Sequence, residues 1–465
     1  MNEWFDAEKH AERAHELYES GRWEEAESEL RHAISLDPYQ GEWHFNLGLT
    51  LEASGRFTDA ILCFEQAHKL QPEDPNSALA AGTNCLRAGR PREALGWLEK
   101  ACSLDPSLMD AYAQRIDAHA RLGEHEQAEV VFYLAQQHEP AGAEIFAAMA
   151  DSLLERGRHE RAVWCLRQAA RIDSGLPGVH ASLARAYAST DRPERARQLY
   201  LLELRRNPGD VETLLDLAGL LERMGRREEA GEKLRRVLEL EPANSDAHFA
   251  LGDLAERSGD FAGAIRHFEA VVRLDAADSD AAVRSARLLM RGRSGATARA
   301  RELLESVCER RGRSPGTLDA GVLSDLCGAL LDADMLEQAK ASLEELVQRQ
   351  PDDSEAHHRL GVARLESGDL AGGIESSRRA VELERGHIAA MHNLALAYLK
   401  LGQFTRSRYW TRRALRREPD DATLKRLRVW LRAHRFIEWG EAAWSWGASR
   451  LMRARSGVLS RAAKR

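Results

Sequence analysis

Apolar side chains recur along the chain at helical spacing, in short stretches separated by small and polar residues. Within residues 41–74 the apolar positions form two groups whose members lie three or four residues apart. They are Trp43, Leu47 and Leu51 in the first group, and Ile61, Phe64, Ala67 and Leu70 in the second. This spacing puts the side chains of each group on one face of a helix. The stretch is therefore predicted to form two amphipathic helices.

The residues between and after these helices indicate where each helix ends. Gly55 interrupts the pattern, because glycine can take the left-handed backbone conformation that ends a helix. Pro72 ends the second helix, because proline lacks the N–H group and disfavours helix at the residue before it. The small residues Gly48 and Ala60 let the two helices approach closely, and Phe64 fills the space beside them.

The same unit recurs every 34 residues, as three interlocked series show. The glycine series is Gly21, Gly55, Gly89, Gly123, Gly157, Gly225 and Gly259, with Asp191 in the vacant place. The proline series is Pro38, Pro72, Pro106, Pro140, Pro208 and Pro242. The alanine series is Ala26, Ala60, Ala94, Ala128, Ala162, Ala196, Ala230 and Ala264. One helix pair cannot bury its apolar face alone, so neighbouring pairs are expected to stack.

In its period and in its pattern of small, large, glycine and proline residues, the unit resembles the tetratricopeptide repeat. The resemblance is clear from Phe45 to Pro72 and extends over roughly residues 7–421 as twelve units. It implies an all-α solenoid of antiparallel helix pairs that winds into a right-handed superhelix. It also implies that the first helix of each pair lines a concave groove. Asp191 and Asp334 stand where other turns have glycine, and aspartate tolerates that conformation moderately well.

The regularity of the array divides the chain into four parts. Residues 1–278 hold about eight repeats, and residues 279–319 hold a distorted ninth repeat and a loop. Residues 320–421 hold the last repeats, and residues 422–465 hold a capping helix and a basic, tryptophan-rich tail. The segment 291–319 is rich in arginine and glycine, and we interpret it as an exposed loop, or alternatively as a hinge or a contact loop.

Composition and charge narrow the class of protein. Hydrophobic residues make up 43% of the 465 residues and charged residues 30%, which is typical of a chain that folds around a core. The net charge of −8 is uneven, because the residues from Thr405 onward carry +12 and the rest carry −20. The start lacks a signal-peptide pattern, and no apolar stretch approaches about 18 residues, so a cytoplasmic location is expected. The 58 arginines against 8 lysines point to a GC-rich, bacterial genome.

The sequence carries no pattern of catalytic, cofactor-binding or metal-binding residues. There is no phosphate-binding glycine loop, no nucleophile elbow and no H-E-x-x-H pair. The six cysteines form no C-x-x-C pair, and we interpret them as small packing residues. A non-enzymatic protein without a cofactor or a metal is therefore expected.

Acidic residues gather where the resemblance puts the concave groove. They fall on the first helices of the fourth, fifth and eighth units and recur about two turns apart. The residues are Asp110, Asp117, Glu144, Asp151, Glu155, Asp246, Asp253 and Glu256. Such rows could attract a basic peptide. Because acids in a first turn also oppose the helix macrodipole, the alternative is a solvated face beside Arg121, Arg223 and Arg257.

The basic C-terminal end carries four of the ten tryptophans within a short stretch. Three leucines, Leu424, Leu427 and Leu431, fit a helix that caps the last repeat over residues 422–435. Residues 436–465 are interpreted as a basic amphipathic helix that contacts a membrane surface or a partner protein, or alternatively as a frayed tail. The candidate contact residues of the tail are Trp430, Trp439, Trp444, Trp446, Arg450 and Arg453. Nucleic-acid binding is disfavoured, because the acidic array would repel phosphates.

The sequence therefore predicts a protein-binding scaffold or adaptor that presents a pre-formed groove to a peptide or domain. One alternative is a membrane-peripheral assembly factor anchored by its tail. Another is the regulatory array of an enzyme whose catalytic part is a separate chain. The identity of the partner, the pathway and the oligomeric state do not follow from the sequence.

Overall fold

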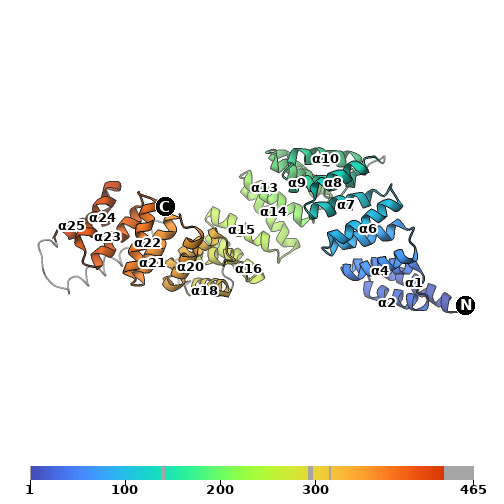
Figure 1. The fold of residues 1–465 in the computed structure, drawn as a ribbon, viewed down its shortest axis with the longest axis horizontal. Coiled ribbons are helices and arrows are strands. Elements are labelled where there is room, and N and C mark those ends of the chain that lie inside the picture. The colour runs from blue at the N-terminus through green and yellow to red at the C-terminus, as the bar shows by residue number, and fades with distance from the viewer. Residues whose placement is uncertain (1, 138–141, 292–296, 314–315, 434–465) are drawn as a thin grey trace. The chain divides into compact units, whose positions relative to one another are not determined.

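The structure, a computed structural model, describes residues 2–137, 142–291, 297–313 and 316–433. Over these residues the chain forms 25 α-helices and no β-strand (Figure 1). The first helices of successive pairs are α1 (Asn2–Glu19), α3 (Gly41–Ala53), α5 (Pro75–Arg87), α7 (Met109–Arg121), α9 (Ala143–Glu155), α11 (Val179–Ser189), α13 (Val211–Arg223), α15 (Ser245–Ser258), α17 (Ser279–Arg291), α19 (Ala320–Asp332), α21 (Ser354–Glu366) and α23 (Ile388–Lys400). The second helices are α2 (Trp23–Leu36), α4 (Phe57–Leu70), α6 (Pro91–Leu104), α8 (His125–Ala135), α10 (His159–Ile172), α12 (Pro193–Arg206), α14 (Arg227–Leu240), α16 (Phe261–Leu274), α18 (Thr297–Arg313), α20 (Leu336–Arg349), α22 (Leu370–Leu383) and α24 (Phe404–Arg417). A last helix, α25 (Ala422–Ala433), follows the twelfth pair.

This order of helices confirms the repeat array that the sequence predicts, and so does the geometry of the turns. After α3, Gly55 has a φ of 79°. The amide of the next residue, Arg56, donates to the carbonyl oxygen of Leu51 at 2.9 Å, which closes the helix end. Asp191 and Asp334 take the same conformation, with φ of 55° and 59°, as expected for residues in glycine's place.

Small residues bring the two helices of a pair together. All eight alanines of the 34-residue series are fully buried, and so are Ala300 and Ala339 of the later, less regularly spaced repeats. A Cβ atom added at Gly48 would lie only 2.6 Å from Cε1 of Phe64, and the Phe64 side chain is itself fully buried. The contact between α3 and α4 therefore leaves no room for a larger side chain, as the sequence predicts.

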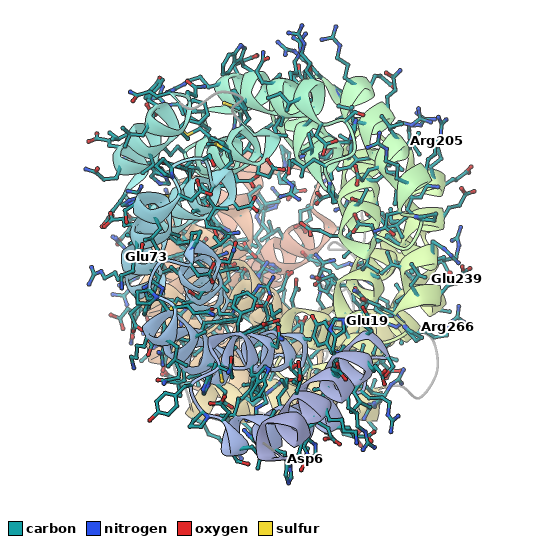
Figure 2. All side chains as sticks on the ribbon, turned by 90° about the vertical axis from the view of Figure 1, so that its right-hand side faces the viewer. Asp6, Glu19, Glu73, Arg205, Glu239 and Arg266 are labelled. Atoms are coloured by element: carbon teal, nitrogen blue, oxygen red, sulfur yellow. The ribbon has the colours of Figure 1, made fainter. Side chains whose placement is uncertain are left out.

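The contacts divide the chain into two compact units, Met1–Arg236 and Val237–Arg465, with the division inside α14. Within each unit the first helices of neighbouring repeats contact each other, as α7 does with α9 and α17 with α19. No two second helices make comparable contact in the described part of the chain. Because helices lie closest together on the inner side of a curve, the first helices line the concave side of each unit. Figure 2 shows the arc of the first unit, with Arg205 of α12 on its outer side.

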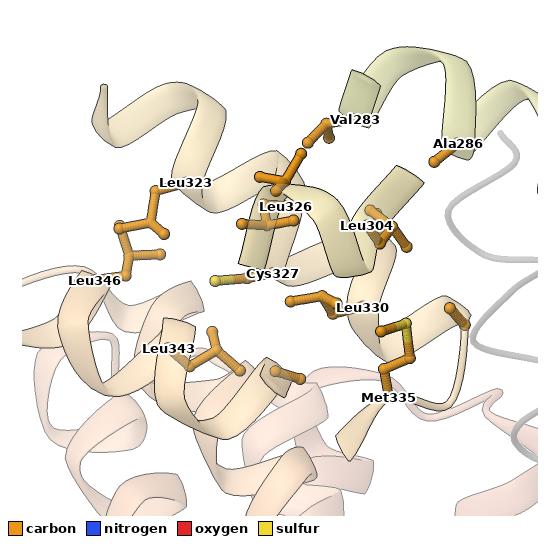
Figure 3. Close-up of a cluster of buried hydrophobic side chains, with 14 of the residues drawn as sticks. Val283, Ala286, Leu304, Leu323, Leu326, Cys327, Leu330, Met335, Leu343 and Leu346 are labelled. Carbon is orange, nitrogen blue, oxygen red and sulfur yellow. The ribbon is translucent and has the colours of Figure 1, made fainter. Parts of the chain in front are cut away.

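The expected loop over residues 291–319 is mostly helix. α18 occupies Thr297–Arg313. Its Leu304 joins a buried cluster with Val283 of α17 and Leu330 of α19 (Figure 3). The prediction of an exposed loop was wrong here because arginine favours helix, and one glycine near a helix end costs only about 1 kcal/mol. The alternative of a hinge stays a hypothesis.

Candidate partner-binding surface

The acidic residues predicted to line the groove all lie on first helices, on the inner side of their unit. The residues are Asp110 and Asp117 on α7, Glu144, Asp151 and Glu155 on α9, and Asp246, Asp253 and Glu256 on α15. The helices α7 and α9 belong to the first unit and α15 to the second. The two groups differ in the charges that surround them.

Asp151 is the most distinctive acid of the first unit. Among the described residues it has no hydrogen-bond or ion-pair partner, and its side chain is open to solvent. The surrounding protein nevertheless removes part of its hydration. This desolvation is the main reason that the pKa of Asp151 is raised to about 6; Asp117 and Glu155 add to the rise, and Arg185 opposes it. One carboxylate of α7 and one of α9 therefore both act on the Asp151 carboxylate.

The other acids of this group are partly compensated. Asp117 pairs with Arg121, one turn along α7, at 2.9 Å, as the alternative interpretation expects. Arg121 also donates to the carbonyl oxygen of Leu86 at 3.0 Å, which ties α7 to α5. Asp110 is exposed and Glu144 is partly buried, and both lie in the first turn of their helix. The uncompensated charge therefore concentrates on α9 and the start of α7.

In the second unit, the protein's own arginines neutralise much of the acidic row. Asp253 forms ion pairs with Arg257 and Arg284, each at 2.8 Å. Arg284 also lies 3.8 Å from Glu256. Asp246 is exposed, in the first turn of α15, where an acid opposes the helix macrodipole. This group therefore carries less uncompensated negative charge than the group on α7 and α9.

One cationic residue of the inner surface was not predicted. Arg185 of α11 stands 34 residues after Asp151, at the same position of the repeat. Its guanidinium lies 2.8 Å from Glu212 and 3.2 Å from Asp216, both on α13. The spacing that reveals the acidic rows would also have found Arg185, because it shows where a repeat position changes sign.

The helix α25 caps the last repeat, as the sequence predicts. Leu424, Leu427 and Leu431 are buried against α23 and α24. Trp430 packs against the same apolar cluster, so only part of its ring faces solvent. The remaining tail candidates, Trp439, Trp444, Trp446, Arg450 and Arg453, lie outside the described residues.

The described residues contain no group of three or more histidine, cysteine, aspartate or glutamate side chains placed to hold a metal ion. No described helix is both long and apolar enough to cross a membrane. Burial raises the pKa of Cys63, Cys85 and Cys165 to about 11, so these thiols stay protonated near neutral pH.

Comparison with known proteins agrees with the repeat geometry. One model of the tetratricopeptide repeat matches residues 12–78, 45–108, 147–211, 215–281 and 252–315. Two further models of the same repeat match residues 293–361 and 387–417. The chain belongs to the tetratricopeptide repeat family. Members of this family are in general scaffolds for protein interaction, and no curated protein matches the sequence.

Solved structures of other repeat proteins resemble parts of this tetratricopeptide repeat protein. The pilF protein of Pseudomonas aeruginosa is 20% identical over 47% of this chain and 97% of its own, with a TM-score of 0.40. A thermophilic tetratricopeptide repeat protein of Thermus thermophilus is 25% identical over 39% of this chain and 98% of its own, with a TM-score of 0.36. The human IFIT1 dimer is 17% identical over 80% of this chain and 81% of its own, with a TM-score of 0.43. With TM-scores below 0.5, these structures add nothing to the functional argument.

Proposed function

We propose that this tetratricopeptide repeat protein is a non-enzymatic scaffold or adaptor, and that the inner surface of α7 and α9 binds a basic segment of a partner protein. The observation that carries the proposal is the pair Asp151 and Glu155. Neither forms an ion pair among the described residues, whereas Asp253 of the second unit forms two. A guanidinium or ammonium group of a partner would form an ion pair with these two carboxylates.

The physics of this site favours a basic ligand. The raised pKa of Asp151, about 6, reflects the cost of keeping its charge in a partly desolvated place near other carboxylates. A bound cation offsets the repulsion from Asp117 and Glu155 and stabilises the charged form of Asp151. Because helix packing holds the surface in place, little conformational entropy is lost from the protein on binding.

The proposal is tested by fluorescence anisotropy with a labelled hexa-arginine peptide and the full chain. The double variant Asp151→Asn with Glu155→Gln is expected to bind the peptide roughly three- to tenfold more weakly at low salt. Asp246→Asn is the matched control, because it removes one exposed inner acid from the second unit. Equal affinity of the double variant and the wild-type protein would contradict the proposal.

A second candidate function, peripheral membrane binding, is supported by the basic surface of α24 and α25. Residues 404–433 contain ten lysines and arginines. Among the described residues only Lys425 of this group pairs with a carboxylate, that of Asp420 at 2.9 Å. The same surface exposes Tyr409 and Val429 by 56% and 61%. Cationic groups interspersed with apolar ones suit the interface of an anionic bilayer.

Co-sedimentation with vesicles containing phosphatidylglycerol tests the membrane candidate. The full chain is expected to sediment, and a chain ending at Ala433 is expected to sediment less. The truncation is placed after Ala433 because removal of α25 would expose the core that its leucines cover. A full chain with Arg412→Gln, Arg416→Gln and Arg417→Gln separates the contribution of α24 from that of the tail. A full chain that stays in the supernatant would exclude this function.

A further inference from the structure

The second unit contains a pocket that neither proposed function uses. Its volume is about 500 Å³, and it lies where the start of α17, the end of α18 and the start of α19 meet. Three arginines of α18 line it, namely Arg310, Arg311 and Arg313. They form the arginine- and glycine-rich segment that the sequence singles out and that the repeat pattern leaves unexplained.

The helix α18, which supplies the three arginines of the pocket, is longer than its neighbours. α18 has 17 residues, whereas α16 and α20 have 14 each. In α16 the last residue, Leu274, comes ten positions after the repeat alanine Ala264. The equivalent position in α18 is Arg310, ten positions after Ala300, and the helix continues for three more residues. The extra residues carry two further arginines over the loop that leads into α19.

Two of these arginines have no acidic partner. Arg310 donates from Nε to the carbonyl oxygen of Ser306 at 3.1 Å, but its Nη1 atom is buried with no hydrogen-bond partner. Arg313 is exposed and forms no ion pair within the described residues. Arg311 differs, because it pairs with Glu345 of α20 at 3.2 Å. A buried guanidinium nitrogen without a partner is costly unless a ligand supplies the acceptor.

The acidic residues of the pocket wall are already engaged. Asp319 caps α19 by accepting from the amide of Gly321 at 2.8 Å. Asp280 of α17 lies 3.2 Å from Nε of Arg284. The residue before Asp319 is also held in place, because Arg349 of α20 donates to the carbonyl oxygen of Leu318 at 2.6 Å. The pocket therefore has a wall held by hydrogen bonds, and it contains two arginines without an acidic partner.

We propose that this pocket binds a phosphate monoester. A phosphate monoester carries nearly two negative charges at neutral pH, which match the two guanidinium groups of Arg310 and Arg313. The planar guanidinium group of arginine can bind two phosphate oxygens at once. The volume of about 500 Å³ exceeds the size of a phosphate group and leaves space for the group attached to it.

Isothermal titration calorimetry of the full chain with O-phosphoserine and with glycerol 3-phosphate tests the proposal, with serine as the probe that lacks phosphate. Both phosphate monoesters are expected to bind, and the tighter of the two shows whether the phosphate comes from a protein or from a small molecule. Arg310→Gln with Arg313→Gln is expected to weaken binding about tenfold or more. The exposed residue Arg266 of α16 provides the control, as Arg266→Gln.

Because Arg310 is partly buried, the single variant Arg313→Gln is measured as well, since an exposed side chain can be replaced without disturbing the core. It is expected to weaken binding severalfold. The proposal would be overturned if neither monoester bound. It would also be overturned if Arg313→Gln and Arg266→Gln bound the monoesters with equal affinity. Binding of serine as tight as that of O-phosphoserine would do the same.

Discussion

Single glycines decide how closely the helices of a repeat pack. Gly48 faces Phe64 at a distance that excludes a methyl group, and Gly252 faces Phe268 in the same way. By contrast, Gly96 lies within α6 with open space where a Cβ atom would be. Glycine is therefore required by contact at the first two positions and only tolerated at the third.

Gly48→Ala is expected to lower the free energy of unfolding by about 1–3 kcal/mol, because the added methyl group forces Phe64 out of its place. Urea denaturation followed by circular dichroism measures the change. Gly96→Ala is the matched control, and it is expected to leave stability unchanged or to raise it by up to about 1 kcal/mol through helix propensity. Equal effects of the two substitutions would show that packing against Phe64 does not determine the loss.

At the residue scale, the sequence predicts positions better than pairings. The 34-residue series correctly predicts the buried alanines and the left-handed turns at Asp191 and Asp334. It cannot predict that Arg284 would neutralise Asp253, because the two residues are 31 positions apart and meet only when neighbouring repeats stack. Side-chain pairing between repeats depends on the angle between them, which the repeat pattern does not specify.

At the scale of elements, a histidine secures the loop before several first helices. His44, His248 and His357 each follow a proline by six residues. Their Nε2 atoms donate to the carbonyl oxygens of Pro38, Pro242 and Pro351 at 3.1, 3.2 and 3.0 Å. The spacing Pro-x5-His was not recognised in the sequence, although it recurs there. It links the end of one repeat to the start of the next.

The histidine of the eighth repeat, His248, also contacts a second histidine, His267 of α16. Because Nε2 of His248 is the donor to Pro242, its Nδ1 atom accepts a hydrogen bond from Nδ1 of His267 of α16, 3.1 Å away. Protonation of the His267 ring would place a charge in a partly desolvated site. Burial, His248 and Arg266 all lower the pKa of His267, while Asp260 opposes them.

The free energy of unfolding is therefore expected to fall as the pH falls from about 7.5 to about 5.5. A histidine with a lowered pKa in the folded chain takes up its proton more readily when unfolded, so its stabilising effect is lost below the ordinary pKa of about 6.5. Denaturation in urea at each pH is expected to show a shallower fall for His267→Gln than for the wild-type protein. The exposed residue His15, replaced as His15→Gln, should leave the slope unchanged. A wild-type slope in His267→Gln would rule out this role.

At the scale of the whole molecule, the proposed partner-binding surface is expected to lose affinity for a basic peptide as the pH falls. Asp151, with its pKa near 6, loses its negative charge as the pH falls through that value. Affinity for the hexa-arginine peptide should therefore decline between about pH 7 and pH 5. Asp151→Asn should decline less, because the charge is already absent. Anisotropy titrations across this range check the prediction, and parallel declines would assign the pH dependence to other groups.

The sequence predicts the architecture of the whole molecule but not its division into two units. The boundary falls inside α14, between Arg236 and Val237, where Gly225, Ala230 and Pro242 keep the regular spacing. No insertion, breaker or change in composition marks this place. The one irregularity that the sequence does show, near α18, lies within a continuous core. The spacing of repeat residues predicts how neighbouring helices pack. The division into two units depends on the contacts of many repeats together, which that spacing does not specify.

The cap formed by α25 limits how the protein can associate. In a stacked array, the exposed face of the last repeat is shaped to receive another repeat, so an uncovered end is a template for joining a second copy. Head-to-tail joining of this kind does not close, and it builds filaments. Leu424, Leu427 and Leu431 cover the apolar face that such a copy would need. A helix of 12 residues thereby occupies the place that an added repeat would need next to α23 and α24.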